Sequence, residues 1–144
     1  ARTADPEQRG AYLLNAAQGA REANDWQSVR ASLAQLQVMI LDENDTLQRR
    51  LLQAELLVHE RNPAGALQLL STPPAATTTL DLRIRYHQDV AATYRQMGNL
   101  LETANALQAV DALQVAVAAV VGSARARGGR WVAGCAASRT SGAC

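Results

Sequence analysis

Three short stretches, Asn24-Asp25-Trp26, Arg61-Asn62-Pro63 and Gly98-Asn99-Leu100, recur at one interval along the chain. Their first residues, 24, 61 and 98, are 37 positions apart. Asn, Asp, Gly and Pro are the residues that end one helix and begin the next. Each stretch therefore predicts a tight turn between two antiparallel helices, and the fixed interval predicts a repeated helix pair.

The same interval aligns further positions on either side of the turns. A small residue recurs before each turn, and a Leu recurs after it. A third column lies close before the turn, and a fourth lies just inside the second helix. The columns are Ala17, Ala54 and Ala91; Leu33, Leu70 and Leu107; Ala20, Leu57 and Tyr94; and Val29, Ala66 and Thr103. A small residue lets two helices approach closely, and a Leu fills the groove between them.

Capping signals locate the expected helices. Asp25 and Asn62 are good N-caps, and Pro63 suits the first helical position. The segment 45–48 reads as a capping box that opens a helix at Asp45. The expected spans are 6–23 and 25–41 for the first pair, 45–60 and 63–70 for the second, and a third pair that begins near Thr79 and turns at Gly98. The Pro-containing segment 71–79 is expected to be a loop.

Composition supports an all-α chain and argues against nucleic-acid binding. Of 144 residues, 48% are hydrophobic and 3% aromatic, with no Phe, which favours helices over a sheet. All basic residues are Arg. Ten Arg and thirteen acids fall within residues 1–121, a formal charge of 10 − 13 = −3. Nucleic-acid binding normally requires a clustered basic face.

The chain is expected to divide into a helical repeat domain, 1–121, and a C-terminal tail, 122–144. The tail is either flexible or non-native, because residues 114–144 contain no acid, Leu or Ile and do not continue the repeat. No signal peptide is recognisable, and no apolar run approaches the 18 residues of a membrane span.

Candidate reactive residues lack the spacing that catalysis or metal binding needs. His59, His87, Cys135 and Cys144 do not approach one another in a ligand motif. The acidic segment 42–45 lacks the Gly and the terminal Glu of a calcium loop. The serines Ser28, Ser32 and Ser71 have no glycine elbow. We therefore expect no metal, no cofactor and no enzymatic activity.

The segment 87–99, from His87 to Asn99, resembles the tetratricopeptide family, although the interval is 37 residues where that family has 34, and Pro63 replaces an aromatic at the turn. The resemblance implies antiparallel helix pairs stacked in a right-handed superhelix of about three repeats. In such arrays the first helix of each pair lines a concave face that receives a protein partner. The register gives Gln18, Arg21, Glu22, Glu55, Val58, His59, Ala92, Arg95 and Gln96 as facing residues, of which the polar ones are the predicted partner-binding set. Arg21 and Arg95 would pair with a partner carboxylate, and Glu55 with a basic group. An ordinary solvated helix face is the alternative for each.

A narrower resemblance is carried by 24–26 with 33–36, by 48–57 and by 62–70. In order and pattern these segments are similar to the N-terminal domain of LpoA-type outer-membrane lipoproteins, which activate a bifunctional penicillin-binding protein. The resemblance implies a periplasmic parent protein, tethered to the outer membrane by a lipid anchor, with a second domain like periplasmic binding proteins. The alternative is a cytoplasmic tetratricopeptide adaptor that binds a peptide segment of its partner.

Overall fold

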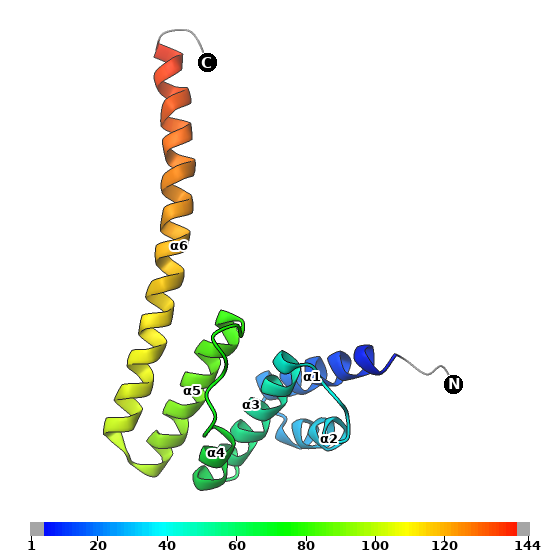
Figure 1. The fold of residues 1–144 in the computed structure, drawn as a ribbon. Helices are drawn as coiled ribbons and strands as arrows, with labels where there is room; N and C mark the ends of the chain where they lie inside the picture. The colour runs from blue at the N-terminus through cyan, green and yellow to red at the C-terminus, as the bar shows by residue number, and fades with distance from the viewer. Residues whose placement is uncertain (1–4, 141–144) are drawn as a thin grey trace. The chain divides into compact units, whose positions relative to one another are not determined.

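The computed structural model describes the backbone of residues 5–140 and the side chains of residues 5 and 8–122 (Figure 1). Residues 5–140 contain helices and no strand, which confirms the all-α prediction. The helices are α1 (Pro6–Glu22), α2 (Trp26–Leu36), α3 (Glu43–His59), α4 (Pro63–Leu69), α5 (Leu80–Met97) and α6 (Leu100–Thr140). The chain forms two units, Ala1–Val110 and Asp111–Cys144.

The three predicted turns share one backbone geometry. Asn24, Arg61 and Gly98 all have positive φ, at 61°, 64° and 76°. The next N–H in each turn donates to a carbonyl five residues back, from Asp25 to Ala20 at 2.8 Å, from Asn62 to Leu57 at 2.8 Å and from Asn99 to Tyr94 at 3.0 Å. This bond, with the left-handed residue before it, is the Schellman ending of a helix. The 37-residue interval is therefore present in the hydrogen bonds as well as in the sequence.

The residue that ends each first helix also caps the second. The side chains of Asp25, Asn62 and Asn99 accept the backbone N–H three residues on, from Ser28 at 3.2 Å, Gly65 at 3.0 Å and Glu102 at 3.2 Å. Each cap satisfies a donor that the first helical turn leaves free. One residue thus closes one helix and opens the next, which explains why the turns are so short.

Two predicted boundaries were wrong. Helix α3 begins at Glu43, because Asp42 and not Asp45 is its N-cap and accepts the Asp45 N–H at 2.7 Å. Helix α2 ends at Leu36 instead of 41. The Arg49 guanidinium reaches back from α3 and donates to the carbonyl oxygens of Leu36, at 2.9 Å, and Met39, at 3.3 Å. These bonds replace the helical ones that a longer α2 would have made.

The aligned columns form the core of the first unit. The three column Ala residues are at most 2% exposed, and Leu33 and Leu70 are 5% and 2% exposed. Leu33 packs with Leu52 of α3, and Leu70 packs with Leu82 and Tyr86 of α5. The first helix of the following pair therefore covers each of these Leu residues. Leu107 is 39% exposed, since within the first unit no described helix follows α6.

Helix α6 differs from the expectation for the C-terminus. The division between the two units falls after Val110. The domain limit at residue 121 stays a prediction. The predicted tail, 122–144, is helical through Thr140, and residues 141–144 lie outside the described part. The segment Leu100–Gly122 is also long and apolar enough to cross a membrane by length and composition, and 11% of its most apolar 18-residue window is buried. This finding corrects the expectation that no apolar stretch reaches that length.

Candidate interaction pocket

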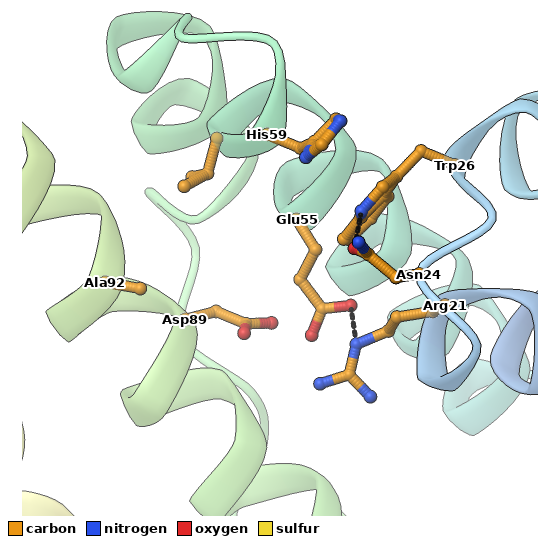
Figure 2. Close-up of a pocket in the computed structure, with 8 residues that line it drawn as sticks. Arg21, Asn24, Trp26, Glu55, His59, Asp89 and Ala92 are labelled. Atoms are coloured by element: carbon orange, nitrogen blue, oxygen red, sulfur yellow. Dashed lines mark hydrogen bonds and ion pairs between the residues drawn. The ribbon is translucent and has the colours of Figure 1, made fainter.

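A pocket of about 300 Å³ opens in the first unit between α1, α3 and α5 (Figure 2). Most of its lining comes from the first helix of each pair, and the rest comes from the turn between α1 and α2. The lining residues are Arg21, Asn24, Trp26, Glu55, Val58, His59, Asp89 and Ala92. Its volume lies at the small end of ligand sites, which span roughly 300–1,000 Å³. A single side chain fits such a space.

Glu55 of α3 holds two arginines from neighbouring helices. Arg85 of α5 forms a two-pronged contact, with Nε 3.0 Å from Glu55 Oε1 and Nη2 2.7 Å from Oε2. Arg21 of α1 places Nε 2.8 Å from the same Oε2 (Figure 2). The Glu55 side chain is 9% exposed, and the paired Arg85 side chain is 16% exposed. The Glu55 carboxylate therefore links α3 to both α1 and α5, the first helices of the other two pairs.

Gln18 extends this network along α1. Its side-chain oxygen accepts Arg85 Nη1 at 2.8 Å, and its nitrogen donates to Glu22 Oε1 at 3.0 Å. All three guanidinium nitrogens of Arg85 are thus hydrogen bonded. Bidentate pairing of this kind fixes the guanidinium plane as well as its charge. Arg85, which is not itself a lining residue, thus holds the Glu55 carboxylate of the pocket in a fixed orientation.

The carboxyl of Asp89, which lines the pocket, has a raised pKa. Asp89 is 8% exposed, and its carboxyl points across the pocket toward Glu55 (Figure 2). Burial, the negative charge of Glu55 and a hydrogen bond with that carboxylate raise the pKa of Asp89 to about 9, against the smaller opposing pull of Arg85 and Arg21. Asp89 is therefore a neutral acid at pH 7. Its Oδ2 atom is buried and has no hydrogen-bond partner.

An aromatic pair forms another part of the wall. The Trp26 and His59 rings stack, with centroids 4.7 Å apart and planes inclined by 15°. Trp26 Nε1 donates to the Asn24 side-chain oxygen at 2.7 Å, which fixes the indole over the turn. The left-handed conformation of Asn24 thus serves both the turn and the pocket.

The predicted partner-binding residues separate into two groups. Arg21, Glu55 and His59 line the pocket, and Gln18 and Glu22 adjoin it through the Arg85 network. Gln96 lies outside the lining and donates to the Val58 carbonyl at 2.9 Å. Arg95 is exposed and does not line the pocket. Glu55 has both oxygens engaged by arginines of its own chain, so the expected pairing with a basic partner group would first have to displace one of them.

Four contributors were not selected from the sequence: Asn24, Trp26, Arg85 and Asp89. A signal for Asp89 existed. One interval earlier, its column contains the buried Leu52, but two intervals earlier it contains the exposed Asn15, so the column alone does not predict a buried carboxyl. Arg85 precedes Asp89 by four residues, the spacing of an ion pair on one helix face. The spacing of Arg85 and Asp89 was therefore the available sequence signal.

Among the described residues, no group of three or more His, Cys, Asp or Glu side chains is placed to hold a metal ion. Burial and the charge of Arg83 lower the pKa of His87. His59 is stacked on Trp26. The pocket chemistry consists of charge pairing, hydrogen bonding and aromatic contact.

No protein-family model matches the chain, and no curated protein matches it in sequence. A solved structure does match. The LpoA N-terminal domain from Haemophilus influenzae superposes on 77% of this chain with a TM-score of 0.64 and 21% sequence identity. The chain has the fold of the LpoA N-terminal domain. It spans about half of that structure, 49% of its length. The resemblance to LpoA that the sequence predicted is thus confirmed at the level of the fold.

Proposed function

We propose that this chain is a non-catalytic protein-interaction and spacer domain of a periplasmic lipoprotein, tethered to the outer membrane, that activates a bifunctional penicillin-binding protein in peptidoglycan synthesis. The observation that carries the proposal is the LpoA N-terminal fold over 77% of the chain. The lipid anchor would belong to the longer parent protein, and it would be the only membrane attachment.

The arrangement of the helices supports an interaction role. Stacked helix pairs present their first helices on one side, and here α1, α3 and α5 together line the pocket. The identical turns at Asn24, Arg61 and Gly98 support a regular stack, which we propose to be a right-handed superhelix of about three repeats. Such a stack holds partner-facing side chains at fixed spacings.

The chemistry of the pocket supports binding in preference to catalysis. Its charged groups are paired with one another, with Glu55 held by Arg21 and Arg85. The Ser28 hydroxyl donates to the Asp25 carboxylate, which also accepts the Ser28 backbone N–H as the cap of α2, so this contact serves the helix end. We therefore propose that the chain is not an enzyme and that it needs no cofactor.

The test is a binding measurement between the whole chain and a purified bifunctional penicillin-binding protein, by biolayer interferometry. Glu22→Arg and Arg95→Glu reverse two exposed charges of the predicted partner-binding set. Each should weaken binding about tenfold, which corresponds to about 1.4 kcal/mol. Arg9→Glu is the matched control, because Arg9 is exposed. It lies nine residues before Gln18, which is two and a half helical turns, and therefore on the opposite side of α1.

Each result decides between named alternatives. Weakening by the two reversals and not by the control supports docking at the first helices. Binding that all three variants retain would place the docking surface elsewhere than on the first helices, whereas binding by the full-length parent alone would make the domain a spacer. Absence of binding by the wild-type chain would contradict direct docking and favour the cytoplasmic adaptor that binds a peptide.

A further inference from the structure

We propose that the pocket between α1, α3 and α5 is a receptor for a guanidinium group, supplied by an arginine side chain of the protein partner. The structural basis is the buried, unpartnered Oδ2 of Asp89 beside the Glu55 carboxylate and the Trp26–His59 stack. The inference rests on the interaction role proposed above and names the chemistry of the group that is recognised.

The Oδ2 atom of Asp89 lacks a hydrogen-bond donor. Buried polar atoms in folded proteins are nearly always hydrogen bonded, so an orphan marks a place where a partner is due. Asp89 makes a side-chain hydrogen bond with Glu55, and this leaves Oδ2 as an acceptor without a donor. Gln96 on the same helix also buries an unpaired acceptor, Oε1, while its nitrogen is engaged by Val58. Of these two atoms, Asp89 Oδ2 belongs to a residue that lines the pocket, and Gln96 Oε1 does not.

The charges around Asp89 allow a cation to bind in exchange for the Asp89 proton. With Asp89 neutral, the one charged carboxylate of the lining, Glu55, is paired with two arginines, Arg21 of the lining and Arg85, which adjoins it. If an incoming cation takes the place of the Asp89 proton, Asp89 becomes an anion and the summed charge of the site stays the same. A partner carboxylate would instead bring further acceptors to a wall whose unpaired atom is already an acceptor.

The shape of the pocket suits a flat cationic group. A guanidinium is planar, carries five N–H donors and stacks on aromatic faces. The pocket offers an indole and an imidazole in near-parallel contact, beside the carboxyl that needs the donors. Its volume of about 300 Å³ accommodates one long side chain. An ammonium group would satisfy the charge and would gain less from the flat aromatic wall.

The test uses two small probes of nearly the same size and shape, N-acetyl-arginine amide and N-acetyl-citrulline amide, in which a neutral urea oxygen replaces one nitrogen of the guanidinium. Binding to the whole chain is followed by ¹H–¹⁵N NMR, with the Trp26 indole N–H as reporter. We expect the arginine probe to bind about tenfold more tightly than the citrulline probe, since hydrogen bonds to charged groups are the stronger ones. The shifts should concentrate at the pocket lining.

Matched variants assign the effect to Asp89. Asp89→Asn keeps the shape of the side chain and removes its charge, so the preference for the arginine probe should disappear. Asp81→Asn, an exposed acid on the same helix, should leave the preference unchanged. Should Asp89→Asn lose its folded spectrum, Trp26→Leu provides the second variant, with binding followed through the backbone amides of the pocket lining. It should weaken binding of the arginine probe several-fold by removing the aromatic surface.

The dependence on pH gives an independent readout. Asp89 faces Glu55 and His59 on α3, Arg21 on α1 and Arg85 on its own helix. Because binding releases the Asp89 proton, affinity for the arginine probe should rise by up to about tenfold per pH unit from pH 7 toward pH 9 in the wild type. Binding of the citrulline probe should not follow this rise.

Equal binding of both probes, no binding of the arginine probe, or an unchanged preference in Asp89→Asn would each overturn the inference. These results are separable from the proposed function. Loss of penicillin-binding-protein binding with intact arginine selectivity would contradict the proposed function alone. Partner binding without arginine selectivity would contradict this inference alone.

Discussion

The turns and the pocket of the first unit are built on opposite principles. The three turns repeat one arrangement, with a left-handed residue, a bond to the carbonyl five residues back and a capping side chain. The pocket depends on residues that occur once, such as Trp26 and Asp89, at positions where the other repeats have different side chains. The comparison indicates that repeated residues make the stack and unrepeated ones give it a site.

The largest expected effect contrasts two members of the same Leu column. Leu70→Ala removes a side chain that α5 covers, so it should cost about 2–5 kcal/mol of the free energy of unfolding. Leu107→Ala, at the exposed third position, should cost less than about 1 kcal/mol. Urea denaturation followed by circular dichroism measures both. Equal losses would show that burial does not distinguish the third position from the others.

The second contrast concerns two glutamates. Glu55→Gln removes the charge that holds Arg21 and the largely buried Arg85, and it should cost about 3 kcal/mol. Glu60→Gln breaks the exposed pair with Arg30 and should cost at most about 1 kcal/mol. The same denaturation experiment compares them. A loss in Glu55→Gln no larger than that in Glu60→Gln would show that the network does not hold the three first helices together.

The third prediction follows from the Asp89 carboxyl. Its pKa is raised from 3.8 to about 9 in the folded chain, so over this range the folded state binds a proton that the unfolded state has lost. Stability should therefore fall as pH rises from about 4 to about 9, by up to about 1.4 kcal/mol per pH unit. Asp89→Asn should flatten the curve over this range. The difference between the two unfolding-versus-pH curves is the measurement, and coincident curves would contradict the neutral acid.

The smallest effects should come from the turns themselves. Gly98→Ala places a side chain at φ 76° and should destabilise the chain by about 1 kcal/mol. Arg61→Gly relieves the same strain at φ 64° and should stabilise it by about 1 kcal/mol or less. Thermal unfolding would show shifts of opposite sign. Shifts of the same sign would show that the shared backbone geometry does not determine the cost of each turn.

The sequence predicted the parts of this fold that depend on local chemistry. Asp25, Asn62 and Gly98 locate the helix ends because caps and left-handed residues act over a few positions. The end of α2 was mispredicted because it depends on Arg49, which reaches back from α3 through tertiary packing. No local pattern encodes such a contact.

The pocket was predictable only in part, for a related reason. Arg21, Glu55 and His59 follow from the helix register, since facing residues recur at the repeat interval. The register gave Ala92, Arg95 and Gln96 as the facing residues of α5, and of these Ala92 lines the pocket. Asp89 and Arg85 were missed because they lie nearer the start of the helix. Burial of a charged residue depends on how deeply the helices interlock, which the repeat alone does not specify.

The most direct test of this account is backbone hydrogen exchange of the whole chain with and without a purified bifunctional penicillin-binding protein. The account predicts added protection in α1, α3 and α5, concentrated near Arg21, His59 and Asp89. Helices α2 and α4 should exchange as they do in the free chain. Protection confined to α2 and α4, or no change in the presence of the partner, would contradict the claim that the first helices of the pairs form its docking site.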